Sequence, residues 1–472
     1  MTRKILRLSP LMAVCLVLVG LLAASCATGS PQSTFDAQGE VSKQQLQLFY
    51  IIFWAAVVVF VGVESLLIIA VLKFRRKPGQ GVPEQVHGNT RLEIVWTLVP
   101  AIILAVIAVP TVITIVKLEN PPAGEAELNV TVVGHQWFWE FQYPDQGIVT
   151  ANEMHIPVGK VINLTLKSAD VIHSFWIPKL AGKEDVIPNH PNTLWIKADE
   201  VGTYFGQCAE FCGIAHAQMR FRVVVDSQQD FQKWATDFLR PSVDPLGLGQ
   251  EGAQLFTDKG CVACHTITDN PIARGTAGPD LTHFGIRSTI ASGILDSDKF
   301  GENLTKWLTN PGAVKPGNLM AKNTPVYNDP QQALTNKEVA ALVLYLRGLV
   351  PDETKPPRMG GEPVPTPVVG EVPEPGPGDV EKGKAIFASQ GCAGCHSLGS
   401  NNLVGPGLAG FGESAATAVK GLSAGQYVYQ SIVDPGAYAV PGFSGSIMPK
   451  IYGQNLTKQQ LYDLTAYLLS LK

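Results

Sequence analysis

Two cysteines, two histidines and a methionine form a group in this sequence that is well suited to bind a metal. Cys208, Cys212, His216 and Met219 lie in one short segment, and His173 lies upstream in a β-rich stretch. Two thiolates, two imidazoles and a thioether are a soft donor set that favours copper. Two cysteines on one short loop can bridge two copper ions through both sulfurs, and each ion then takes one histidine and one weak axial ligand. The pattern predicts a binuclear copper site that transfers electrons.

Other uses of these cysteines explain fewer of the residues. A disulfide between Cys208 and Cys212 is compatible with an oxidising compartment, but it gives no reason for the spacing of the two histidines and Met219. A single blue-copper site needs only one cysteine, and a structural zinc site has no use for a methionine.

A second chemical motif, Cys-x-x-Cys-His, occurs twice. Its residues are Cys261, Cys264 and His265 in the first copy and Cys392, Cys395 and His396 in the second. The two thiols can bond the vinyl groups of one porphyrin, and the adjacent histidine can reach the iron. A zinc half-site or a thiol redox pair is the alternative for a single copy. Two copies in matched frames predict two covalent haems c.

Each haem needs a second axial ligand, and methionine suits an electron carrier because it raises the reduction potential. Met320 is the candidate for the first haem and Met448 for the second. Met359 competes for the first haem, but it lies after the closing helix of that segment and inside a proline-rich stretch.

The surrounding segments indicate the elements that position these residues. The stretch 125–226 alternates β-rich runs with turn signals, which predicts a small β-sandwich or barrel. Residues 249–350 and 378–472 repeat one pattern of short helices and glycine-rich loops, which indicates a tandem duplication of an all-α domain. Between them, residues 351–377 are rich in proline, glycine and glutamate and predict a semi-rigid linker.

Two apolar segments, about Leu46–Leu72 and Leu92–Val116, are long enough to cross a bilayer and predict a transmembrane hairpin at 45–118. The basic residues between them place that loop in the cytoplasm and all metal motifs outside. Residues 1–26 read as an export signal. They resemble a lipoprotein signal in which Cys26 is lipidated; an ordinarily cleaved signal and a third membrane helix are the alternatives.

Composition limits the function further. With 472 residues, 46% hydrophobic and 16% charged, the chain is long enough for several domains. The net charge of -4 provides no basic field for nucleic acid. We expect a membrane protein with several core-forming units and no nucleic-acid partner.

The copper motif, the hairpin and the aromatic run from His135 to Phe141 resemble subunit II of cytochrome c oxidase, and the two repeats resemble class I cytochrome c domains. The resemblance implies a cupredoxin-like β-sandwich at 125–226 followed by two all-α cytochrome c domains. It implies that the five copper-motif residues ligate CuA. It also implies that Glu210 supplies a backbone carbonyl to CuA and a carboxylate to a magnesium ion at the boundary with subunit I. Trp137 matches the position where electrons enter, and Glu93 matches a carboxylate at the mouth of a proton channel. Pro279 and Pro406 would accept hydrogen bonds from the haem histidines.

The expected function is that of the electron-input subunit of a proton-translocating cytochrome c oxidase in a bacterial plasma membrane. Electrons from an external cytochrome c would pass through the two haems c and CuA to subunit I, which would hold the oxygen site. Two alternatives remain open at this point: the electron-input subunit of a CuA-type nitric oxide reductase, and a lipid-anchored carrier that serves no oxidase. Quinol is not an expected donor, because quinol-oxidising relatives lack the copper ligands.

Overall fold

The computed structural model describes most of the chain outside its N-terminal segment. The described residues are 30–75, 79, 81, 87–122, 126–270, 272–358, 374–403, 405–419, 422–435, 440, 448 and 452–471. The expected export signal with Cys26, the competing ligand Met359 and most of the proline-rich linker lie outside the described residues.

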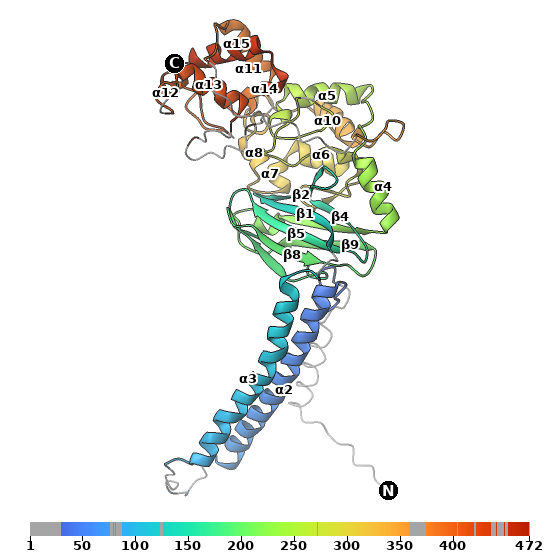
Figure 1. Cartoon of the computed structure of the whole chain (residues 1–472), viewed down its shortest axis with the longest axis vertical. Coiled ribbons are helices and arrows are strands. Elements are labelled where there is room, and N and C mark those ends of the chain that lie inside the picture. Colours follow the sequence, from blue (N-terminus) through green and yellow to red (C-terminus); the bar gives the residue numbers. More distant parts are fainter. Residues whose placement is uncertain are drawn as a thin grey trace.

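Two long helices form the hairpin at one end of the molecule (Figure 1). Helix α2 spans Glu40–Lys73 and α3 spans Thr90–Glu119, with 34 and 30 residues. Each contains an 18-residue hydrophobic window with a mean hydropathy of 2.7. Their apolar side chains contact little protein, because no part of either hydrophobic window is buried within the chain. A crossing needs about 20 helical residues. Both helices are therefore long and apolar enough to anchor the protein in a membrane.

Two carboxylates mark these helices. Glu64 lies half-buried in the middle of α2. Glu93 lies in the first turn of α3, where its Oε1 accepts a hydrogen bond from the Asn89 amide at 3.3 Å and the Asn89 side chain caps the helix. Glu93 therefore has a local role at the helix start, and its proton-channel role stays a prediction.

The hairpin leads into a sandwich of two five-stranded sheets, ordered β3-β2-β1-β5-β8 and β4-β10-β9-β6-β7. The strands are β1 Ala126–His135, β2 Phe138–Tyr143, β3 Ile148–Ala151, β4 Glu153–Pro157, β5 Val161–Ser168, β6 His173–Trp176, β7 Lys183–Val186, β8 Asn192–Ile196, β9 Gly202–Cys208 and β10 Arg220–Asp226. Alternating side chains of both sheets fill one core, in which Trp139, Phe141, Phe175 and Phe221 are fully buried. This confirms the predicted β-sandwich.

Helix α4, Gln228–Phe238, follows the sandwich and packs against it. Phe231, Ala235 and Phe238 belong to the same buried core as the two sheets. Trp234 stacks on His155, with ring centroids 4.4 Å apart. The folded unit around the copper motif therefore continues beyond its last strand. Below we call this unit, β1 to α4, the copper domain.

Two helical domains complete the chain. The first contains α5 Leu248–Asp258, β11 Thr289–Ile290, β12 Leu295–Asp296, α6 Glu302–Thr309, α7 Pro311–Val314, α8 Leu319–Asn323, α9 Pro325–Asn328 and α10 Asn336–Gly348. The second contains α11 Val380–Ser389, α12 Phe411–Ala415, α13 Ala424–Val433, α14 Tyr452–Asn455 and α15 Lys458–Leu469. Each has its own apolar core. We call them the first and second cytochrome domains.

The repeat predicted from sequence is visible in how the first and last helices of each domain cross. A Cβ on Gly252 of α5 would come within 2.1 Å of the Ala341 carbonyl oxygen in α10. A Cβ on Gly383 of α11 would come within 2.0 Å of the Asp463 carbonyl oxygen in α15. Glycine is required at both crossings because the helix backbones touch there. The two domains therefore share one packing solution.

The parts follow one another along the long axis of the molecule. The copper domain lies between the hairpin and the first cytochrome domain, and the second cytochrome domain lies at the end opposite the hairpin (Figure 1).

Candidate copper and haem sites

The structure brings the five residues of the copper motif together at one edge of the sandwich. His173 begins β6, Cys208 ends β9, and Cys212, His216 and Met219 lie on the connection from β9 to β10. The Cys208 Sγ lies 3.7 Å from the Cys212 Sγ and 3.9 Å from the His173 Nδ1. The Cys212 Sγ lies 3.6 Å from the His216 Nδ1 and 3.8 Å from the Met219 Sδ. Antiparallel pairing of β6 with β9, which places Phe175 opposite Cys208, is what brings His173 to the loop.

The two cysteines are not joined by a disulfide, since their sulfurs are much farther apart than the bonded distance of about 2.05 Å. The hydrogen bond from the Cys212 thiol lowers the pKa of Cys208 to about 3, and the same pairing raises the pKa of Cys212. One thiolate is therefore already favoured in this buried cluster. A soft, partly anionic set of donors fits copper, since thiolates, thioethers and imidazoles are the ligands that copper prefers.

A carboxylate orients one of these histidines. Asp170 accepts a hydrogen bond from the His173 Nε2 at 2.8 Å and is itself held by the backbone amides of Gln136 and Val171. Burial raises the pKa of Asp170, but these hydrogen bonds outweigh it and leave the pKa below its usual range. Since Nε2 carries the proton, Nδ1 has a free lone pair that points toward the sulfurs. Sequence reasoning missed Asp170, although a carboxylate three residues before a ligand histidine is a readable signal.

Glu210 meets the cluster through its backbone. Its carbonyl oxygen lies 3.2 Å from the Cys208 Sγ, whereas its carboxylate is exposed and accepts a hydrogen bond from the Phe211 amide at 3.1 Å. Among the described residues, the cluster of histidine, cysteine and acidic side chains close enough to share a metal is His173, Cys208 and Cys212. The Glu210 carboxylate is not part of that cluster.

The two tryptophans of the aromatic run differ in their surroundings. The Trp137 Nε1 donates a hydrogen bond to the Cys212 carbonyl oxygen at 3.0 Å, which links this ring directly to the copper loop. Gln136 donates to the same oxygen at 2.7 Å. Trp139 is fully buried and packs edge-on against Phe175 and Phe221. Trp137 thus lies against the copper loop, and Trp139 is a core aromatic.

The first Cys-x-x-Cys-His motif forms a tight turn after α5. The His265 Nδ1 donates to the Pro279 carbonyl oxygen at 2.9 Å, and burial lowers the pKa of the ring. A neutral imidazole with Nδ1–H leaves Nε2 free to bind iron. Met320 lies on α8 and packs, half-buried, against the core of this domain.

The second motif repeats this geometry after α11. The His396 Nδ1 donates to the Pro406 carbonyl oxygen, again at 2.9 Å, and burial again lowers the pKa of the ring. Met448 packs half-buried against the second core. The hydrogen bonds expected at Pro279 and Pro406 are therefore confirmed. In both domains two free thiols and a neutral histidine lie on one turn, which fits covalent haem c.

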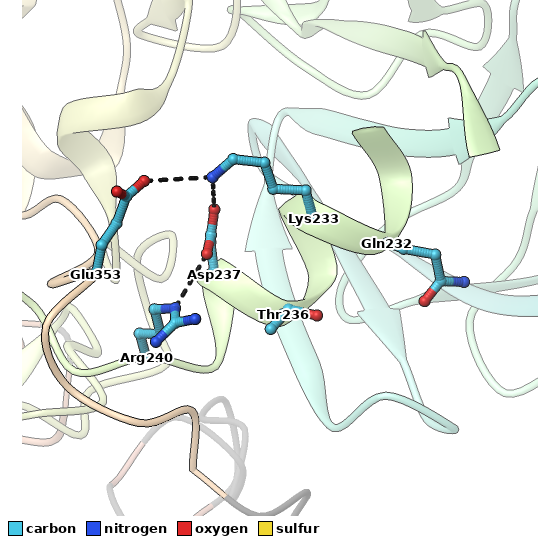
Figure 2. Close-up of a pocket in the computed structure, with 6 residues that line it drawn as sticks. All are labelled: Gln232, Lys233, Thr236, Asp237, Arg240 and Glu353. Atoms are coloured by element: carbon cyan, nitrogen blue, oxygen red, sulfur yellow. Dashed lines mark hydrogen bonds and ion pairs between the residues drawn. The ribbon is translucent and has the colours of Figure 1, made fainter. Parts of the chain in front are cut away.

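A pocket beside α4 involves different residues. It is lined by Gln232, Lys233, Thr236, Asp237, Arg240 and Glu353 (Figure 2). Lys233 points between Asp237 and Glu353, and the Arg240 Nε donates to Asp237 at 3.0 Å. These ion pairs tie α4 to the segment that follows the first cytochrome domain. The pocket contains none of the ligands predicted from sequence.

Comparison with known proteins agrees with this arrangement. The chain matches the family model for the periplasmic domain of cytochrome c oxidase subunit II over residues 147–227 and the model for its transmembrane domain over residues 30–113. A cytochrome c model matches twice, over residues 249–349 and 380–472.

Curated relatives match along most of their length. The chain is 35% identical over 349 residues to cytochrome c oxidase subunit 2 of Alkalihalophilus pseudofirmus, covering 73% of this chain and 96% of the relative. It is 38% identical over 354 residues to cytochrome c oxidase subunit 2 of Bacillus sp. (strain PS3), covering 70% and 95%. A solved periplasmic domain of cytochrome oxidase subunit II from Bradyrhizobium japonicum is 35% identical, with a TM-score of 0.24, and covers 24% of this chain and 94% of that domain. The chain belongs to the cytochrome c oxidase subunit II family, with two cytochrome c domains on the same polypeptide.

Proposed function

We propose that this chain receives single electrons from an external cytochrome c and delivers them to subunit I of a proton-translocating haem-copper oxidase. The observation that carries the proposal is the convergence of five soft donors. The sulfurs of Cys208 and Cys212 lie 3.7 Å apart, and donor atoms of two histidines and a methionine lie 3.6 to 3.9 Å from them. Copper and haem c, when bound, supply reversible one-electron redox chemistry. The oxygen site lies in another chain.

In this proposal the copper is a binuclear CuA centre held by this chain's own side chains. Its ligands are His173, Cys208, Cys212, His216 and Met219, with the carbonyl oxygen of Glu210. Cys208, Cys212 and Met219 are buried, and His173 is fully enclosed. The β-scaffold shields these four side chains from water and holds them in place, and His216 is half-buried. Asp170 fixes the orientation of His173, which supports fast electron transfer because little has to move.

The haems are proposed to be held in the same way in both cytochrome domains. Thioether bonds would form at Cys261 and Cys264 with His265 and Met320 as axial ligands, and at Cys392 and Cys395 with His396 and Met448. The carbonyl oxygens of Pro279 and Pro406 hold the two histidine rings in the tautomer that can bind iron.

Three further roles come to this chain through the family. The exposed carboxylate of Glu210 is proposed to bind magnesium together with subunit I. Trp137 is proposed as the residue through which electrons reach the copper loop, which its hydrogen bond to the Cys212 carbonyl supports. Glu93 is proposed to lie at the mouth of a proton channel in subunit I.

We also propose the orientation of the chain in a bacterial plasma membrane. The α2–α3 connection would lie in the cytoplasm, because Lys73 and Arg75 flank this connection at one end and Arg91 flanks it at the other. The copper and cytochrome domains would then lie outside the cytoplasm. Lipidation of Cys26 would add a second anchor.

The test is electron paramagnetic resonance of the purified oxidase complex, with copper and haem c counted per chain. We expect a mixed-valence signal from two equivalent copper nuclei together with two covalent haems. Cys208→Ser should abolish the copper signal and leave both haems, whereas Thr203→Ser, an exposed change on the same strand, should leave both unchanged. A complex without copper in which Cys208 and Cys212 are disulfide-bonded would refute the proposal.

A further inference from the structure

The first cytochrome domain covers the backbone of Trp137. The Lys315 Nζ donates hydrogen bonds to the Trp137 carbonyl oxygen at 2.6 Å and to the Ser292 Oγ at 3.0 Å. The Ser292 Oγ donates in turn to the same carbonyl at 3.0 Å. Lys315 is only 3% exposed, and burial lowers the pKa of its amine to about 7. Either protonation state keeps the two N–H donors that this contact uses.

Two more contacts hold the same face. The buried carboxylate of Glu153 on β4 accepts hydrogen bonds from the backbone and side chains of Ser288 and Thr289 in the first cytochrome domain, at 2.7 to 3.1 Å. The Arg222 guanidinium, also buried, donates to the Gly293 carbonyl oxygen at 3.3 Å. A buried carboxylate and a buried guanidinium are strongly destabilising without partners. The copper domain and the first cytochrome domain are therefore built to stay together.

The contact at Trp137 is continuous with the predicted haem ligand Met320. Lys315 directly follows α7, and Met320 lies in α8, which begins a few residues later. Asn318 connects them: its Nδ2 donates to the Lys315 carbonyl oxygen at 2.6 Å, and its Oδ1 caps α8 by accepting from the Ala321 amide at 2.8 Å. The loop that touches Trp137 thus also positions the helix that carries Met320.

The two cytochrome domains meet at their Cys-x-x-Cys-His turns. The Cys395 Sγ lies 3.9 Å from the Ala263 carbonyl oxygen. A Cβ on Gly394 would lie 3.4 Å from the Cβ of Ala263, and a Cβ on Gly391 would lie 3.4 Å from the Val262 side chain. Small residues let the two turns approach closely. The second domain extends from this joint away from the copper domain (Figure 1).

From these contacts we propose that Lys315 keeps the first cytochrome domain docked on Trp137 as the resident donor to the copper domain, and that the external carrier reduces the second domain. This order rests on the function proposed above. One electron leaves the reduced external carrier for the second domain, passes to the first domain, and then enters the copper domain. No bond forms or breaks, and each donor is oxidised by the one electron that its acceptor gains.

The order is tested by pulsed electron paramagnetic resonance of the copper signal in the whole complex, because a nearby ferric haem speeds copper relaxation and a ferrous haem does not. Met320→His and Met448→His each lower the reduction potential of one haem, since methionine ligation raises it. Each variant is poised so that only the altered haem stays ferric, and relaxation is measured on the copper that remains oxidised.

We expect Met320→His to keep the fast relaxation of the fully oxidised complex and Met448→His to slow it severalfold. Equal rates, or the reverse order, would overturn the inference while leaving the proposed function intact. A missing copper signal or a missing haem would instead count against the proposed function.

The role of Lys315 is tested by Lys315→Met, with Lys337→Met as the matched control because Lys337 is an exposed lysine of the same domain. We expect Lys315→Met to increase oxidative labelling of Trp137 severalfold and to slow copper relaxation, with no change in Lys337→Met. If Lys315→Met does not fold, Ser292→Ala provides the test, because it removes the second donor to Trp137. It should increase the labelling of Trp137 and slow copper relaxation by smaller amounts. Unchanged labelling and relaxation in the folded variants would show that Lys315 does not hold this contact.

Discussion

The two cytochrome domains are alike where a haem has to be held and different where they face neighbours. In both, the histidine of the motif donates to a proline carbonyl at 2.9 Å. The first domain is fastened to the copper domain by buried charged groups at Glu153, Arg222 and Lys315. The second meets the first through small residues of the motif turns. The shared histidine contacts follow from the need to bind a haem. The different surface contacts follow from the neighbour that each domain packs against.

Removing the haem thiols from one domain at a time should have the largest effect and should reveal the difference between the two domains. Cys261→Ala with Cys264→Ala, or Cys392→Ala with Cys395→Ala, should each remove half of the covalent haem, as measured by the haemochrome spectrum of the denatured complex. Both pairs should stop reduction of copper by an external cytochrome c, because each removes one step of the path. The first pair should also slow reduction of copper by a small mediator. The second pair should leave copper reducible by a small mediator such as reduced phenylenediamine. Identical behaviour of the two pairs toward the mediator would contradict different positions in the electron path.

A smaller effect is expected from Glu153→Gln, which loosens the docking of the first domain alone. The carboxylate accepts four hydrogen bonds from Ser288 and Thr289. In glutamine an NH2 group replaces one carboxylate oxygen, and this group cannot accept the hydrogen bonds that the oxygen accepted. Loss of hydrogen bonds to a charged group destabilises by about 1.5–3 kcal/mol. Hydrogen exchange of residues 288–293 should accelerate accordingly.

The matched control for that change is Glu413→Gln, at an exposed glutamate of the second domain. It should leave hydrogen exchange of the same segment unchanged. Protection that survives Glu153→Gln intact would mean that the docking does not depend on this carboxylate.

The smallest effect concerns acid stability of the last helix in each domain. The capping box of α10 uses Glu338, whereas that of α15 uses the neutral Gln460. The hydrogen bond from the Thr335 amide, together with Lys259, lowers the pKa of Glu338 to about 2 from a usual 4.5. A lowered carboxylate pKa stabilises the fold above pH 4.5, and this contribution is lost as the pH falls toward 2.

Hydrogen exchange of α10 should therefore accelerate between pH 4.5 and 2, after correction for the intrinsic pH dependence, and that of α15 should not. Because Glu338 is near the surface, we expect less than about 1 kcal/mol. Glu338→Gln should flatten the response of α10, and Gln460→Glu should introduce one in α15. A flat response of α10 in the unchanged protein would show that this cap adds no acid-sensitive stability.

Prediction from sequence succeeded for features that hydrophobic runs and repeated spacings record. The fold class, the membrane hairpin and the repeat were readable, because hydrophobic runs and the spacing of Gly252 and Gly383 reflect local packing needs. The packing of α4 on the sandwich was not foreseen. Its Phe231 and Trp234 carry an ordinary amphipathic pattern that does not say which surface they will cover.

The sequence by itself determined which chemistry is available, because Cys208 to Met219 and each Cys-x-x-Cys-His turn place their donor atoms together within a few residues. The sequence names His173 as a candidate ligand, but only the tertiary pairing of β6 with β9 brings its ring to the cysteine sulfurs. Tertiary structure also decided that Lys315 lies against Trp137. Most lysines in proteins are exposed, and no sequence feature of this loop marks Lys315 as a buried one. Only the packing of one domain on another buries that amine, since burial at an interface depends on residues distant in the chain.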